Sequence, residues 1–309
     1  MPPAPFPAAA STVLAPPAPL WQLVLRSLPV PVLMSAICWV GAGVNYLLFH
    51  TLAELFSIVI AMVAMVVVTT SQRFTRYHFV VYIAVAIGWC GGLDLLHMLM
   101  FKGLHLLPSD SANPPTQLWV AARFIQAVAL VTSPLLLNRS VRLLHVQAGF
   151  GVAAALSVTL IAAGLFPTAY VDGQGLTPFK IYAEFAIIGL LACALALFWR
   201  YRALMSTRLL ANLVAAVVFM ILSELAFTRY ASVYAPANLL GHLLKIFACW
   251  YVYLALVHST LREPFSMLAR AASTYDAVPD PTLIVTANGN IHQANEAAAR
   301  YAGQAAAQL

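Results

Sequence analysis

The chain has 309 residues, of which 62% are hydrophobic and only 8% are Asp, Glu, Lys or Arg. About a quarter of the residues of a soluble domain are charged, so this composition, with a mean hydropathy of +0.86, excludes an ordinary soluble protein. The net charge of +6 comes largely from arginines between apolar runs, which indicates membrane topology and not a nucleic-acid partner.

The N-terminal stretch is rich in Pro and Ala, and its first 20 residues carry no charge. Because no basic segment precedes an apolar core, a cleaved signal peptide is not expected. We expect residues 1–28 to form a disordered cytoplasmic tail. The four cysteines lie singly inside apolar runs, so the sequence indicates neither a zinc knuckle nor a disulfide framework.

Apolar runs of about 20 residues predict an all-α polytopic membrane protein with eight transmembrane helices. The boundary between the first and second runs, which are nearly continuous, is placed near His50. The predicted spans are 29–49, 51–71, 78–101, 116–137, 146–166, 178–199, 209–229 and 237–260.

The loops between the spans alternate in charge, which predicts their orientation. One set carries the arginines, and the positive-inside rule places that set in the cytoplasm. An even number of spans then puts both termini in the cytoplasm. The arginines of this set are Arg26, Arg73, Arg76, Arg139, Arg142, Arg200, Arg202, Arg208 and Arg262.

Ionisable side chains within the spans lie toward the outer side. Ions inside a membrane are costly and usually face an interior site, and spacings of three, four or seven residues place several of these side chains on shared helix faces. Ten residues form this predicted layer, which we call the polar layer: His50, Glu54, Asp94, His97, Arg123, Lys180, Glu184, Glu224, His242 and Lys245.

The balance of charge in the polar layer predicts pairing across helices. Its four acids face three bases, with Lys102 or Arg229 as a fourth. Unpaired ions in hydrocarbon cost several kcal/mol each, so ion pairs are expected. The layer is then either a network that holds helices together or a pocket that binds a ligand.

The chemistry of a ligand site stays open at this point. His50, His97 and His242 with Glu54 or Asp94 could hold zinc or copper. Two of the histidines could instead ligate haem. A small organic ligand, anionic beside the bases Arg123, Lys180 and Lys245, is a third possibility.

Six segments with a recognisable pattern recur in order along the predicted spans. They are FHTLAELFSIVIA (49–61), GLDLLHMLMFKG (92–103), TQLWVAARF (116–124), TPFKIYAEF (177–185), SELAFTRY (223–230) and NLLGHLLK (238–245). Together they resemble the third family of bacterial membrane-associated sensor domains, over about residues 30–260. The resemblance implies the sensory front end of a histidine kinase, a diguanylate cyclase or a phosphodiesterase in the inner membrane, and it implies no particular stimulus.

Residues 261–274 follow the predicted sensor domain (29–260). Their sequence pattern predicts a juxtamembrane signalling helix. Apolar residues recur there at alternating spacings of four and three, which favours a parallel homodimer stem. An ordinary amphipathic helix is the alternative, and Pro264 weakens the stem. The seam consists of Leu261, Phe265, Leu268, Ala272 and Tyr275.

Residues 275–309 resemble the opening of a PAS domain, in the order strand, turn, strand, helix. Asn288-Gly289 is a hairpin signal, Asn295 a helix N-cap and Gly303 a C-cap. A PAS core needs about a hundred residues, so we expect a truncated fragment of an α+β domain.

These features predict a membrane sensor, most directly of a sensor histidine kinase. Its expected partners are membrane lipid, a second copy of the chain, a small ligand or metal, and a downstream output domain or response regulator. The alternatives are a transporter, which needs a polar path through both leaflets, and a haem- or metal-binding oxidoreductase. The chain offers no nucleophile–base pair or phosphate loop, so no catalytic residue is assigned.

Overall fold

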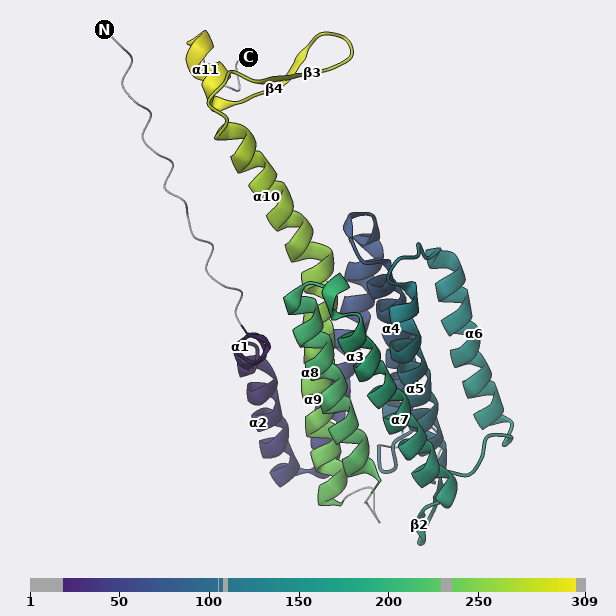
Figure 1. Cartoon of the computed structure of the whole chain (residues 1–309). Coiled ribbons are helices and arrows are strands. Elements are labelled where there is room, and N and C mark those ends of the chain that lie inside the picture. The colour runs from purple at the N-terminus through teal and green to yellow at the C-terminus, as the bar shows by residue number, and fades with distance from the viewer. Residues whose placement is uncertain (1–18, 105, 108–110, 229–234, 304–309) are drawn as a thin grey trace.

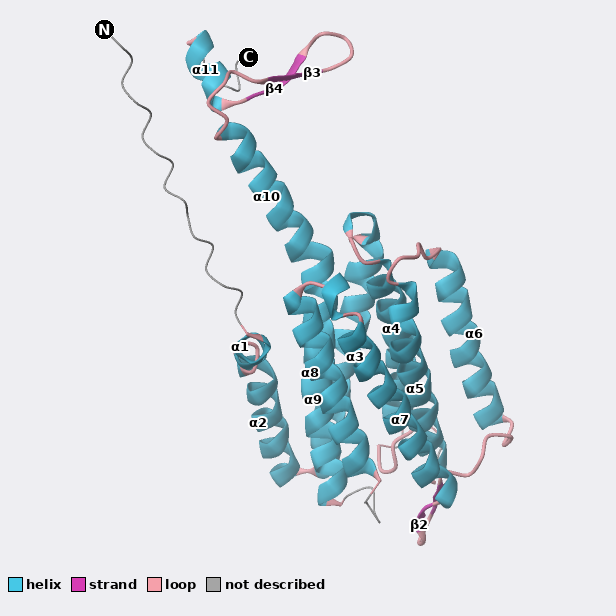
Figure 2. Cartoon of the chain, viewed as in Figure 1, coloured by secondary structure: helices cyan, strands magenta, loops and turns pink. Residues whose placement is uncertain are grey.

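A computed structural model describes residues 19–104, 106–107, 111–228 and 235–303. The described chain is a helical bundle with an extension at one end (Figures 1 and 2). Seven helices are long and apolar enough to cross a membrane: α3 (Tyr46–Thr70), α4 (His78–Leu99), α5 with the short turn η2 (Asn113–Leu136), α6 (Leu143–Ala162), α7 (Pro178–Arg200), α8 (Thr207–Phe227) and the continuous helix Pro236–Asp276. The predicted all-α polytopic fold is therefore confirmed.

The first predicted span is the exception in length. It is present as α2 (Pro29–Val44), an apolar helix of 16 residues. A straight span needs about 20 residues, so α2 is shorter than that length and than the seven candidate spans. It lies at the edge of the bundle, against α3 and α9 (Pro236–Val257).

The boundary between α2 and α3 lies at Asn45, and the prediction near His50 was wrong. Asn45 has extended backbone, and its Oδ1 accepts a hydrogen bond from the N–H of Leu47 at 2.8 Å. Hydropathy does not register this cap, because one polar residue hardly changes the mean of a long apolar run. His50 is consequently a buried residue one turn inside α3.

Removing this cap should cost stability. We expect Asn45→Ala to lower the free energy of unfolding by about 1 kcal/mol, because one N–H of the first turn of α3 loses its acceptor. Thermal unfolding of the detergent-solubilised protein measures the change. Asn45→Asp keeps an acceptor oxygen and should be close to the unchanged protein; equal losses in both variants would contradict the capping role.

The stretch before α2 also differs from expectation. Residues 1–18 of the predicted tail lie outside the described residues, but Leu20–Leu25 form a short helix, α1. Two aromatic side chains of α9 anchor the end of this helix: Tyr251 Oη donates to Val24 O and Trp250 Nε1 donates to Ser27 O, both at 2.8 Å. The described chain thus begins at the end of the bundle where α9 leads into the extension.

Six helices make the main body of the bundle. Helix α3 packs on α4 and α9, α4 packs on α5, α5 on α7, α7 on α8, and α8 on α9. Helix α6 lies outside this ring against α4 and α5, and only Ala154 of it is buried. The half of the bundle nearer the extension has an apolar core, in which Phe79, Ile83 and Phe198 are fully buried.

The extension begins without a break in the helix. Helix α9 passes through the wider π-helical turn η4 (His258–Arg262) into α10 (Glu263–Asp276). Pro264 is the second residue of α10, directly after the π turn. A proline cannot supply its N–H to the preceding turn, and its place at the first turn after η4 explains why it does not end the helix.

Beyond α10 the predicted order of strand, turn, strand and helix is present. Strands β3 (Leu283–Val285) and β4 (Ile291–Ala294) pair antiparallel, and α11 (Glu296–Ala302) follows. Gly289 in the turn and Gly303 after α11 have positive φ, and Asn295 Oδ1 accepts from the N–H of Ala298. These elements agree with the opening of a PAS domain, and that assignment stays a prediction.

Candidate functional site

Among the described residues, the buried Asp, Glu, His, Lys and Arg side chains are the ten residues of the polar layer. Each lies within about three turns of one end of its helix. That end is the N-terminus of α3, α5, α7 and α9 and the C-terminus of α4 and α8. In an antiparallel bundle these ends meet, so the layer occupies the end opposite α10 (Figure 1). Their role as a ligand site stays a prediction.

A first ion-pair network joins four helices. Arg123 Nη2 of α5 contacts both carboxylate oxygens of Asp94 of α4, at 2.7 and 2.5 Å. Lys245 Nζ of α9 lies 2.9 and 2.7 Å from the oxygens of Glu54 of α3, and 3.2 Å from Asp94 Oδ2. Two carboxylates therefore balance two cations, as the need to pair buried ions requires.

An aromatic ring and an amide complete the surroundings of these cations. The guanidinium of Arg123 lies 4.9 Å from the centre of the Trp119 ring, and Lys245 Nζ lies 4.6 Å from it. Arg123 also donates to Gln126 Oε1. The Trp119 ring thus lies within cation–π distance of both cations of the network, which stabilises them.

A second group lies between α7 and α8. Lys180 donates to Glu184 one turn along α7, and Glu224 of α8 interacts with Glu184. The centre of the Phe227 ring lies 5.9 Å from Lys180 Nζ and 5.1 Å from the centre of the His242 ring. Glu224 also interacts electrostatically with Arg123, which links this group to the first network.

The three predicted histidines gather with Glu54. One possible ligand atom from each of His50, His97, His242 and Glu54 lies within 4.8 Å of all the others. We call these four residues the histidine group. Asp94, the other predicted carboxylate, is instead engaged with Arg123 and Lys245.

The hydrogen bonds of two of these rings define which nitrogen carries the proton. His97 Nδ1 lies 2.7 Å from Pro115 O, and His242 Nδ1 lies 2.8 Å from Asn238 O. A carbonyl oxygen only accepts, so Nδ1 must donate in both rings. In neutral imidazoles this leaves the lone pair on Nε2, the atom that faces the group.

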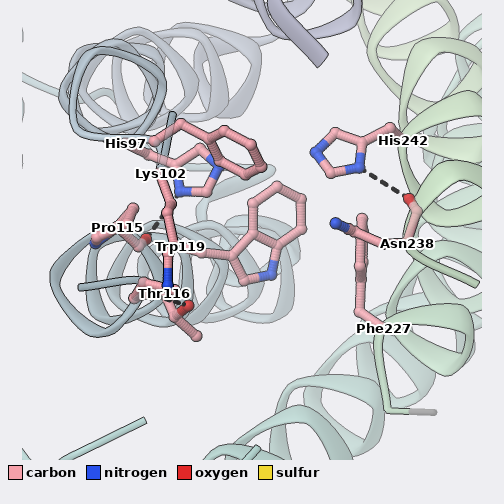
Figure 3. Close-up of a pocket in the computed structure, with 10 residues that line it drawn as sticks. His97, Lys102, Pro115, Thr116, Trp119, Phe227, Asn238 and His242 are labelled. Atoms are coloured by element: carbon pink, nitrogen blue, oxygen red, sulfur yellow. Dashed lines mark hydrogen bonds between the residues drawn. The ribbon is translucent and has the colours of Figure 1, made fainter. Parts of the chain in front are cut away.

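A small pocket opens beside the histidine group (Figure 3). His97 and His242 project from opposite walls, with the Trp119 indole between them. Its cavity volume is about 20 Å³, room for about one water-sized particle. Lining residues that sequence reasoning missed are Phe101, Ala112, Pro115, Thr116 and Phe227.

One sequence signal could have identified part of this lining. Phe101 lies four residues after His97, and Thr116 lies seven residues before Arg123. Such spacings are common on apolar helix faces, so they do not identify a pocket. Phe227 needs Gly241 on α9, because a Cβ there would lie 2.5 Å from the Phe227 ring. That close approach of α8 and α9 is a tertiary feature.

Lys102, another predicted base, lines the pocket, but its ion pair lies outside the polar layer. Lys102 pairs at 2.7 Å with Asp172 in the loop before α7, and both side chains are exposed. Hydrogen bonds from Lys102 and then Ser111 hold the pKa of Asp172 below its usual value. Lys102 therefore pairs outside the polar layer, and Arg229 lies outside the described residues.

The comparison with protein families agrees with the resemblance seen in the sequence. The family model MASE3, described as a membrane-associated sensor domain, matches residues 42–264. This range contains all ten residues of the polar layer and the π turn. We found no match among curated proteins or solved structures.

Proposed function

Because this chain belongs to the MASE3 family of membrane-associated sensor domains, we propose that it is the sensory input region of a bacterial signal-transduction protein. The output enzyme is a histidine kinase, with a diguanylate cyclase or phosphodiesterase as the alternative. The protein spans the inner membrane, with both termini in the cytoplasm. A ligand enters the polar layer from the outer side.

One observation carries this proposal: the helix that leaves the membrane also supplies the pocket. His242 and Lys245 of α9 lie in the polar layer, and the same helix continues through η4 to Asp276. A shift of α9 at the pocket therefore moves the start of the segment that resembles a PAS domain. Signalling requires two such arrangements that a ligand distinguishes.

Lys245 provides the two arrangements. Its ammonium group contacts Glu54 of α3 and Asp94 of α4 at the same time. A ligand that engages Glu54 would leave Lys245 with Asp94, and a ligand that engages Asp94 would do the reverse. Either change alters which helix holds α9 most strongly.

The distribution of buried charge supports a sensor over a transporter. Among the described residues, no buried Asp, Glu, His, Lys or Arg lies in the half of the bundle nearer α10. A transporter usually binds its substrate near the middle of the membrane and needs a path on both sides. The apolar core of that half offers none.

The surface of α10 supports a parallel dimer. Phe265 and Leu268 of the predicted seam are 66% and 63% exposed. Apolar side chains at this spacing pack well against a second copy of the same helix. Dimerisation would bring two output domains together.

Lys245→Met tests the proposal in the polypeptide with its native output domain, in membrane vesicles. We expect output activity to change by about 5-fold to 150-fold, the usual range of coupling between sites. Lys245→Arg keeps the charge and should stay near the unchanged protein. Arg202→Met, an exposed cation in the loop between α7 and α8, should have no effect. Unchanged output in Lys245→Met would refute the proposal.

A further inference from the structure

We infer that His50, His97, His242 and Glu54 bind one transition-metal ion of the zinc and copper class, and that copper(I) suits the site best. The binding claim stands on the geometry of these four side chains. Its use in signalling rests on the proposed function.

The spacing of the four ligand atoms suits a tetrahedral ion. They come from α3, α4 and α9 and lie within 4.8 Å of one another. Ligand atoms about 2.0–2.1 Å from a tetrahedral ion lie about 3.4 Å apart. Each side chain therefore needs to move inward by less than about 1 Å.

The second observation is that the inward-facing nitrogens have no use in the present arrangement. Within the described residues, Nε2 of His50 and of His97 is buried without a hydrogen-bond partner, and the polar atom beside Nε2 of His242 is Glu54 Oε1 at 3.2 Å. An unpartnered buried nitrogen is costly, and one possible ligand atom of each of the three rings lies within 4.8 Å of those of the other two. A metal ion would satisfy all three.

The other ring nitrogens, Nδ1 of His97 and His242, also support a metal site. In metal sites, the ligating histidine donates its other ring N–H to a carbonyl or carboxylate, which orients the ring. His97 and His242 do so to Pro115 O and Asn238 O. With Nδ1 protonated, the lone pair of His242 Nε2 faces Glu54 Oε1 at 3.2 Å. Two acceptors at that distance require a cation between them, either a metal or a proton on the ring.

The charge of the surroundings favours a monovalent ion. Glu54 and Asp94 balance Arg123 and Lys245, so with neutral histidines the site has no net charge. A divalent ion would add two buried charges and a monovalent ion one, and uncompensated buried charge is costly. Imidazole ligands suit both copper and zinc, and of these ions copper(I) carries the smaller charge.

The space available argues against haem. The centre of the His50 ring lies 5.4 Å from the centre of the His97 ring and 4.8 Å from the centre of the His242 ring. A porphyrin between two axial imidazoles needs far more room than these rings leave, and the cavity volume is only about 20 Å³. The space between the four possible ligand atoms, which lie within 4.8 Å of one another, suits a single ion.

Metal binding would act on Lys245. An ion bound to Glu54 repels the ammonium group that now contacts the same carboxylate, and Asp94 lies 3.2 Å away as the other acceptor. The ion would also join α3, α4 and α9 through its ligands. The stimulus in this view is the metal itself.

The test uses the purified chain in detergent, titrated separately with copper(I) under a reductant and with zinc(II). We expect one ion per chain, with nitrogen and oxygen neighbours about 2.0 Å away by X-ray absorption. His97→Ala and His242→Ala should weaken binding by at least about 100-fold, more than the loss of an outer-shell partner. His145→Ala removes an exposed histidine of α6 and should bind as before.

Other outcomes separate the claims. Glu54→Gln keeps the side-chain volume, so a folded Glu54→Gln protein with weakened binding shows that the loss does not come from misfolding. No stoichiometric metal, or equal affinity in both alanine variants and the unchanged chain, would overturn the site. If metal binds but output ignores it, the site stands and its signalling role fails. If Lys245→Met alters output in a chain that binds no metal, the sensor proposal stands and the site fails.

Discussion

Replacing Asp94 with Asn is expected to lower the free energy of unfolding by about 3–5 kcal/mol, the cost of leaving a buried charge without its partner. Asn has the same shape as Asp but no charge. Arg123 would lose a carboxylate that it contacts at 2.5 and 2.7 Å, and Lys245 would lose one at 3.2 Å. Gln126 and the Trp119 ring would remain, and neither carries charge.

The same substitution at an exposed pair provides the control. Asp172→Asn removes the partner of Lys102, whose side chain is 43% exposed. Exposed pairs contribute about 0.2–1 kcal/mol. Thermal or denaturant unfolding in detergent compares the two variants. If both lose the same amount, burial of the Asp94–Arg123 pair is not what makes it important.

A double variant refines this measurement. Adding Arg123→Met to Asp94→Asn removes the stranded cation along with its partner. We expect the double variant to be more stable than the sum of the two single losses predicts, because contacting residues are not additive. Simple additivity would show that the two side chains act independently.

Inserting a single residue between Arg270 and Ala271 of α10 is expected to change output as strongly as a pocket variant. One added residue rotates everything beyond it by about 100° around the helix axis. If α9 and α10 transmit the signal as one continuous helix, output should change by about 5-fold to 150-fold. Output activity of the polypeptide with its native output domain measures this.

A longer insertion is the matched control. Repeating residues 267–273 adds seven residues, which lengthens the helix by about 10 Å but rotates it by only about 20°. Output and its response should then be close to those of the unchanged protein. Equal output from both insertions would mean that α10 is a passive tether.

The helices and the end of the bundle that carries charge follow from short-range features of the sequence. In a membrane, the backbone polar groups of a long apolar run can be hydrogen-bonded only if the run forms a helix. The position of an ionisable residue along such a run then gives its depth in the membrane. The ten buried ionisable residues could therefore be predicted without a structure. The boundary at Asn45 could not, because it depends on one hydrogen bond to Leu47.

The sequence did not determine which side chains of the polar layer contact one another; the tertiary structure did. In the sequence, Asp94 and Glu54 were equal candidates to join the histidines, and Lys102 was a candidate base. Because α3 packs on α9, Glu54 lies beside the histidines. Because α4 packs on α5, Asp94 pairs with Arg123. Lys102 instead pairs with Asp172, which lies 70 residues later in the chain.

The sequence alone determined that this protein is a helical membrane sensor with one charged end, because apolar length, charge position and the family motifs are local properties of the chain. Only the tertiary structure decided which charges meet, that ligand atoms of three histidines and Glu54 lie within 4.8 Å of one another, and that α9 runs unbroken from this group into α10. Those outcomes depend on distances between helices that are far apart in sequence. Contacts of that kind are set by the packing of whole helices and leave no spacing pattern to read.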